Sequence, residues 1–260
     1  MKNRTTLAIL SIITLISTIT INSLANLIPL NGITTGEISD SFPIAFVPAG
    51  YVFSIWSVIY LALAVYTFFE WKQSRSLNPK TTVRVPQLFI VSNILNAAWI
   101  YGWHYGYYTA TLLIMIGLLV TLIAIYKEIR KIDIHKSTQT YTQLTVPFSI
   151  YLGWISVATV ANVSVALVNS GWDGFGIADG YWAGIMVAVA TVLGMLMIIR
   201  ERDGIYPLVL IWSFIGIYIK HNTPNLPTDI SMLRWTCIIA IIILAGLLLR
   251  LRMKSSKRAR

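Results

Sequence analysis

The chain has 260 residues, of which 56% are hydrophobic and 12% charged, and its mean hydropathy is +0.71. This composition excludes an ordinary soluble domain and predicts an all-α, polytopic membrane helix bundle. The formal net charge of +10 does not indicate a nucleic-acid partner, because the basic residues stand in short stretches between apolar runs. The single cysteine, Cys237, excludes a disulfide framework and a cysteine-built metal site.

Eight apolar runs are long enough to cross a lipid bilayer as helices. With the N-terminus in the cytoplasm, this count places 18 of the 20 lysine and arginine residues on the cytoplasmic side, and only Lys220 and Arg234 on the other. Basic residues collect on the cytoplasmic side, so we expect a multi-pass protein of the plasma (inner) membrane with both termini cytoplasmic. The runs cover about residues 5–28, 49–70, 86–103, 107–127, 145–168, 181–199, 204–219 and 231–251, the third and seventh being short.

The first run has two interpretations. Lys2 and Arg4 before it, and Ser23-Leu24-Ala25 near its end, are typical of a cleavable signal over residues 1–25. The run is longer than the usual apolar core of a signal, which favours a retained helix. Both interpretations place the next loop outside the cell.

The polar loop at residues 29–48 contains no basic residue and leads into the second span through a Pro and a Gly. A loop of this length is either a structured lid or a disordered connection. Aromatic residues crowd the first turns of the span, where Trp56 and Tyr60, four apart, share one helix face. Tyr51 and Phe53 also fit an interfacial aromatic belt, whereas Trp56 lies roughly 9 Å inside the helix.

The third predicted span carries Asn93, Asn96, Trp99 and Trp103 on one face, at spacings of three, three and four. Amide side chains in a membrane helix face protein or a cavity rather than lipid. They therefore either orient a ligand or form hydrogen bonds that join helices. His104, at the end of this span, is typical of an interfacial histidine rather than of a ligand or a base.

The fifth predicted span carries Trp154, Ala158 and Asn162, which recur every four residues on one face. Ala158 permits close helix approach, and Asn162 needs a polar partner. At about 1.5 Å per residue, tryptophans and amides of three spans lie at one depth, roughly 6–10 Å below the outer surface. These are Trp56, Asn96, Trp99 and Asn162. Aromatic planes and a few amides at one level predict an apolar small-molecule cavity.

The loop at residues 169–180 contains four glycines and is the one plausible internal boundary. We therefore expect a five-span ligand-binding bundle at residues 1–168 and a three-span extension with a basic cytoplasmic tail at residues 181–260. The two halves show no sequence repeat, so the usual signature of a transporter built from inverted repeats is missing.

These motifs resemble the tryptophan-rich sensory protein family, also called translocator protein or TspO/MBR, over about residues 1–168. The first family motif reads Pro-Pro-Gly-Trp-Val-Phe, followed by a Trp and, four residues later, a Tyr. The third helix of the family has Asn-x-x-Trp, and the fifth has a Pro, then Trp-Val-Ser-Phe-Ala, then an Asn. Here Ala49 replaces the second Pro, Tyr51 replaces the Trp, and one residue is missing before Trp56. The matching residues are Pro48, Gly50, Val52, Phe53, Trp56, Tyr60, Asn96, Trp99, Pro147, Trp154, Ser156, Ala158 and Asn162.

The resemblance implies a five-helix bundle with a pocket closed by the first external loop, here followed by three further helices. It implies binding of porphyrins, sterols or similar flat apolar ligands, often by a homodimer. It implies no required cofactor, a porphyrin or haem-like molecule being the ligand. The ligand-binding residues that the motifs and helix faces indicate are Pro48, Gly50, Tyr51, Phe53, Trp56, Tyr60, Asn96, Trp99, Trp103, Trp154, Ala158 and Asn162.

Three functions compete. A ligand-binding protein, either a sensor or a translocator of flat apolar molecules, accounts best for the tryptophans and amides. A small-molecule permease using all eight spans would need charges or broken helices at mid-membrane, and the spans have no clear central Asp, Glu, Lys or Arg. A membrane enzyme acting on tetrapyrroles would need a nucleophile–base pair, paired carboxylates or a metal cluster. The sequence pattern shows none of these, so we do not expect an enzyme. The histidines, His104, His135 and His221, lie at or outside the span ends.

The predicted topology can be tested by cysteine labelling. Cysteines introduced at Asp40 and Asp173 should react with a membrane-impermeant thiol reagent in intact cells, because both loops are expected outside. A cysteine at Lys131 should not react. Reaction of the cysteine at Lys131 alone would show that the topology is the opposite of the predicted one.

Overall fold

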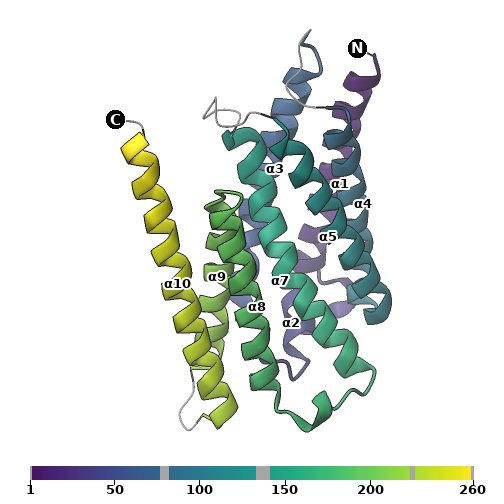
Figure 1. Cartoon of the computed structure of the whole chain (residues 1–260). Helices are drawn as coiled ribbons and strands as arrows, with labels where there is room; N and C mark the ends of the chain where they lie inside the picture. The colour runs from purple at the N-terminus through teal and green to yellow at the C-terminus, as the bar shows by residue number, and fades with distance from the viewer. Residues whose placement is uncertain (1, 77–81, 133–140, 223–225, 259–260) are drawn as a thin grey trace. The chain divides into compact units, whose positions relative to one another are not determined.

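The computed structural model describes residues 2–76, 82–132, 141–222 and 226–258, and His135 lies outside the described residues. The described ranges contain no strand, which confirms the predicted all-α fold. The long helices fall on the predicted runs: α1 (Lys2–Leu27), α3 (Ile55–Gln73), α4 (Arg84–His104), α5 (Tyr108–Arg130), α7 (Val146–Asn169), α8 (Asp179–Ile199), α9 (Ile205–Lys220) and α10 (Thr228–Arg258) (Figure 1). Short elements lie between them: η1 (Leu30–Gly32), α2 (Thr35–Asp40), η2 (Gly50–Ser54), η4 (Tyr141–Thr145) and η5 (Gly174–Gly176).

Six helices in the described ranges are long and apolar enough to cross a membrane, and the chain is an integral membrane protein. The helix α9 is apolar but has only 16 residues. The helix α4 carries the polar side chains of Gln87, Asn93 and Asn96 within its apolar sequence. The predicted total of eight spans therefore stays a prediction. The six segments are Asn3–Leu27, Gly50–Gln73, Tyr108–Arg130, Tyr141–Asn169, Asp179–Ile199 and Thr228–Met253.

Contacts within the chain divide it into two units. The first consists of Met1–Ile38 and Ser54–Ile155, and the second of Ser39–Phe53 and Ser156–Arg260. The helix α7 thus contributes its first part to the first unit and its second part to the second. The Ser39–Phe53 segment, which precedes α3, belongs with the C-terminal helices. This division differs from the sequence-based boundary near residue 168, and the independence of residues 1–168 stays a prediction.

In the first unit, α1 packs against α3 and α4, and α4 packs against α5 (Figure 1). Aromatic rings fill part of its core. The Tyr66 ring lies 4.9 Å from the Phe89 ring and 4.7 Å from the Phe148 ring, measured between centroids. All three side chains are buried, and their edge-on contacts join α3, α4 and α7.

A buried ion pair joins α1 to α3. Glu70 of α3 is fully buried, and its carboxylate lies 3.4 Å from the guanidinium of Arg4. Burying an unpaired carboxylate is strongly unfavourable, so Arg4 offsets the cost of burying Glu70. The pair lies near the first turns of α1 and the last turns of α3, away from the middle of either helix. It does not supply the central charge that the permease hypothesis required.

In the second unit, α8, α9 and α10 pack against one another (Figure 1). Gly194 of α8 permits this close approach, because a Cβ at its position would lie 2.9 Å from Leu244 of α10 and 3.0 Å from Leu210 of α9. Small residues where helices cross are typical of membrane bundles, in which packing rather than the hydrophobic effect holds helices together.

The loop that precedes α3 is structured, as the lid interpretation expected. Its helix α2 begins with a capping box, in which Thr34 N–H donates to Glu37 Oε2 at 2.8 Å and Glu37 N–H donates to Thr34 Oγ1 at 3.3 Å. The hydrogen bonds from Thr34 stabilise the carboxylate and hold the pKa of Glu37 below its ordinary value. The loop is therefore ordered in part by hydrogen bonds between its own residues.

Candidate functional site

An amide bridge joins three helices of the first unit. Asn22 Nδ2 of α1 donates to Asn96 Oδ1 of α4 at 2.9 Å, and Asn96 Nδ2 donates to the Tyr151 hydroxyl of α7 at 2.8 Å. All three side chains are at most 5% exposed. A buried amide in an apolar environment costs free energy unless it is hydrogen-bonded, so the bridge favours one arrangement of α1, α4 and α7.

A second amide of α4 also bonds to α1. Asn93 Nδ2 donates to Thr14 Oγ1 at 3.1 Å, and the Asn93 carbonyl accepts a hydrogen bond from Thr18 Oγ1 at 3.0 Å. The helix-joining role considered for the amides of the third predicted span is therefore observed for both Asn93 and Asn96. A direct contact between Asn96 and a ligand stays a prediction.

Two members of the amide bridge, Asn22 and Tyr151, were not among the predicted site residues. A sequence signal for Asn22 exists, because Thr14, Thr18 and Asn22 recur every four residues in an apolar run. Tyr151 lies three residues before Trp154 and so shares its side of α7. Their partners depend on how the helices pack, which the sequence does not show.

Four aromatic residues, Trp56, Tyr60, Tyr151 and Trp154, form a group that we call the Trp56 cluster. The Trp56 ring stacks on the Tyr60 ring at 5.4 Å with an interplanar angle of 22°. It also meets the Tyr151 ring at 5.9 Å and the Trp154 ring at 6.3 Å, both edge-on. Such contacts favour fixed ring orientations. The structure thus brings together three predicted residues and one that the sequence analysis missed.

The Trp56 cluster contains a polar atom that lacks a hydrogen-bond partner among the described residues. The Tyr60 hydroxyl is buried and makes no hydrogen bond to any residue that the structure describes. Buried hydroxyls are nearly always hydrogen-bonded, to protein or to a bound molecule, so this one calls for an explanation. The Tyr60 and Trp56 side chains as a whole are only half-buried. A flat aromatic surface with one free hydroxyl suits a flat apolar molecule that carries a polar group.

The other predicted tryptophans form a separate group at the end of α4. The Trp99 and Trp103 rings stack at 5.4 Å, and the Tyr108 ring meets Trp103 edge-on at 5.4 Å. Trp103 Nε1 donates to the Thr35 carbonyl at 3.3 Å. Both tryptophans are at most 5% exposed. In this structure Trp103 therefore attaches the loop before α3 to α4.

His104 strengthens the same attachment. Its Nδ1 donates to the Leu30 carbonyl at 3.0 Å, and its Nε2 lies 3.0 Å from Thr35 Oγ1. Asn31 Nδ2 in turn donates to the His104 carbonyl at 3.2 Å. His104 is buried and occupied on both ring nitrogens, so it holds the loop. This role is more specific than the interfacial position that the sequence indicated.

The Ser39–Phe53 segment is bonded to the second unit through the peptide groups of Ala45. Ala45 N–H donates to Asp179 Oδ2 at the start of α8, and the Ala45 carbonyl accepts from His221 Nε2 at 2.8 Å. Nearby, Lys220 Nζ at the end of α9 forms an ion pair with Asp40 at 2.6 Å. Two backbone hydrogen bonds and one charge pair therefore fasten this segment to α8 and α9.

The first family motif packs against α9 in the same unit. Trp212 Nε1 donates to the Val52 carbonyl at 3.1 Å, and the Tyr51 ring meets the Trp212 ring edge-on at 5.4 Å. Ala49 N–H donates to the Gly216 carbonyl at 3.2 Å. Part of the motif thus binds α9, a role that the sequence analysis did not foresee. Trp212 and Gly216 were missed because the sequence separates them from the motif by about 160 residues.

The remaining predicted site residues belong to the second unit. Pro48, Gly50 and Phe53 lie in the Ser39–Phe53 segment. Asn162 is buried in α7, and its Nδ2 donates to the Ala158 carbonyl one turn earlier at 2.8 Å. A contact between any of these five residues and a ligand stays a prediction.

Apolar spanning helices and the buried amides that join them define a helical membrane protein, and the Trp56 cluster is its candidate ligand surface. A family model described as TSPO-like protein matches residues 8–250, and the chain belongs to this family. The match extends past residue 168 and includes α8, α9 and most of α10, so these helices are not outside the family match. Neither the curated proteins nor the solved structures yielded a match.

The packing of the first motif on α9 can be tested at Gly216. A Cβ at this position would overlap Val52 Cγ2 and lie 3.1 Å from Pro48 Cβ. Gly216→Ala should therefore displace the motif and destabilise the folded protein by about 1–3 kcal/mol, measured by thermal unfolding in detergent. Gly184→Ala is the matched control, because a Cβ there meets its nearest atom, Thr236 Oγ1, at 3.7 Å. Equal melting temperatures for the two variants would contradict the close contact.

Proposed function

We propose that the protein binds flat apolar molecules such as porphyrins or sterols at the Trp56 cluster, and acts as a sensor or translocator of them. The observation that carries this proposal is the half-buried Trp56 ring beside a Tyr60 hydroxyl that lacks a hydrogen-bond partner among the described residues. Membership in the TSPO-like family supports a ligand-binding or translocator role.

The chemistry of the Trp56 cluster fits this class of ligand. The indole and phenol faces offer stacking area to a flat ring system, and their mutual contacts already limit their rotation. The Tyr60 hydroxyl can donate to a carboxylate or accept from a hydroxyl, so it would orient a molecule with one polar substituent. Porphyrins carry carboxylates and sterols carry a hydroxyl, which makes both suitable test ligands.

The other predicted residues take supporting roles in this proposal. Asn96 positions Tyr151 through its hydrogen bond, and Trp99 and Trp103 secure the loop at the end of α4. Direct ligand contacts from the second-unit residues remain part of the proposal as sequence-based expectations. So do a homodimer, eight spans, and a plasma-membrane location with both termini cytoplasmic.

The test is a fluorescence titration of the purified full-length protein with protoporphyrin, haem and cholesterol. Tyr60→Phe removes only the hydroxyl and should weaken binding by about 0.5–1.5 kcal/mol, or roughly two- to tenfold. Trp56→Phe should also weaken binding, because it reduces the stacking area. The melting temperature of Tyr60→Phe should hold, since its hydroxyl bonds to nothing that the structure describes.

Tyr66→Phe provides a matched control on the same helix. The Tyr66 hydroxyl is also buried without a hydrogen-bond partner among the described residues, but its ring packs against Phe89 and Phe148. This variant should bind as the unmodified protein does. If Tyr60→Phe and Trp56→Phe remain folded and bind all three ligands with unchanged affinity, the Trp56 cluster is not the binding site.

A further inference from the structure

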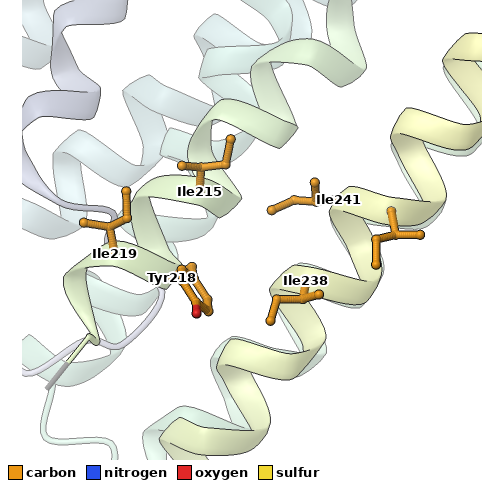
Figure 2. Close-up of a pocket in the computed structure, with 6 residues that line it drawn as sticks. Ile215, Tyr218, Ile219, Ile238 and Ile241 are labelled. Atoms are coloured by element: carbon orange, nitrogen blue, oxygen red, sulfur yellow. The ribbon is translucent and has the colours of Figure 1, made fainter. Parts of the chain in front are cut away.

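An apolar groove lies between α9 and α10 of the second unit, and none of the residues predicted to bind a ligand lines it. Its volume is about 370 Å³. Figure 2 shows Ile238 and Ile241 pointing from α10 toward α9 across this space. The lining residues, which define what we call the isoleucine groove, are Ile215, Tyr218, Ile219, Ile238, Ile241 and Ile242. A groove with this lining suits a hydrocarbon chain and offers almost nothing to a polar molecule.

A cation marks one end of the isoleucine groove. Arg234 lies four residues before Ile238, so both side chains are on the same face of α10. Its guanidinium lies 4.4 Å from the centroid of the Tyr218 ring, which lines the groove. One guanidinium nitrogen donates to Asn222 Oδ1 at 3.1 Å. The contacts on Tyr218 and Asn222 fix the charge where the groove ends.

Arg234 still has an unused donor. Its Nε is buried and has no hydrogen-bond partner among the residues that the structure describes. A guanidinium presents its N–H groups as a fork, which matches the oxygens of a phosphate. A buried donor at the end of an apolar groove therefore indicates an oxyanion attached to a hydrocarbon chain.

The predicted topology gives a second reason to expect an anionic partner for Arg234. Arg234 and Lys220 are the two basic residues that the predicted topology leaves on the external side. Lys220 forms an ion pair with Asp40, which accounts for its position. Among the described residues, Arg234 contacts a neutral amide and an aromatic ring but no carboxylate. A negatively charged group from outside the chain would complete its surroundings.

We propose that the isoleucine groove binds a phospholipid, with an acyl chain between α9 and α10 and the phosphate at Arg234. Charge complementarity decides in favour of this occupant over a second copy of the chain. The apolar groove alone would fit a helix face, but an apolar helix face brings no anion to the buried Nε. This site lies on helices other than those of the Trp56 cluster and does not depend on the proposed function.

The test is native mass spectrometry of the full-length protein in detergent, titrated with dioleoylphosphatidylglycerol. Arg234→Gln keeps a similar size but removes the charge, and should weaken lipid binding about tenfold. Arg250→Gln, an exposed arginine at the far end of the same helix, is the matched control and should leave binding unchanged. Dioleoylglycerol, which has the same chains without the phosphate, should bind Arg234→Gln and the unmodified protein equally weakly.

A second pair of variants tests the groove itself. Ile241→Trp should fill it and weaken phosphatidylglycerol binding as much as Arg234→Gln does. Ile239→Trp places the same side chain at a 55%-exposed position that does not line the groove, and should leave binding unchanged. Melting temperatures of all variants establish that they remain folded.

Three results would overturn the proposal. Equal phosphatidylglycerol binding by folded Arg234→Gln and Arg250→Gln would show that Arg234 does not bind the phosphate. Binding of glycerol 3-phosphate as strong as that of the lipid would indicate a site for a free phosphate. A dimer that Ile241→Trp abolishes, with no bound lipid in the unmodified protein, would make the groove an interface between copies.

Discussion

Hydrogen bonding of the Asn96 amide is the interaction on which the first unit depends. Within an apolar helix, this side chain is stable only because Asn22 and Tyr151 satisfy it. The same hydrogen bond fixes the Tyr151 ring, which is one of the three rings in contact with Trp56. The orientation of the Trp56 cluster therefore rests on a polar bridge between helices. The proposed ligand surface and the helix association share Tyr151, which explains why the sequence could not separate the two roles.

The loop before α3 is also held by side chains and peptide groups that are distant from it in the sequence. Its first part is bonded to Trp103 and His104 at the end of α4, within the first unit. Its second part is bonded to α8 and α9, within the second unit, through Ala45, Ala49 and Val52. Residues of the first family motif thus serve as attachment points for a C-terminal helix. The family match over residues 8–250 is consistent with this, since it includes the helices that provide the attachment.

The sequence predicted those features that depend on local pattern. The lengths of the apolar runs predicted the long helices, and the four-residue spacing predicted that Trp56 lies beside Tyr60. It did not predict the partners of Asn96, because the choice between Asn22, Tyr151 and a ligand is made by packing. It also missed the pairing of Ala49 with Gly216, since a contact across so many residues leaves no periodic signal. The boundary near residue 168 was predicted from the glycines of the 169–180 loop, whereas the contacts within the chain divide α7 after Ile155.

The most direct measurement is a double-mutant cycle between Asn96 and Tyr151 in the free energy of unfolding. Asn96→Leu removes the amide, Tyr151→Phe removes the hydroxyl, and the double variant removes both. If the bridge holds the helices together, the effects should be non-additive, with a coupling of about 0.5–3 kcal/mol. Additivity within about 0.3–0.5 kcal/mol would contradict the account, because it would mean that the two side chains act independently.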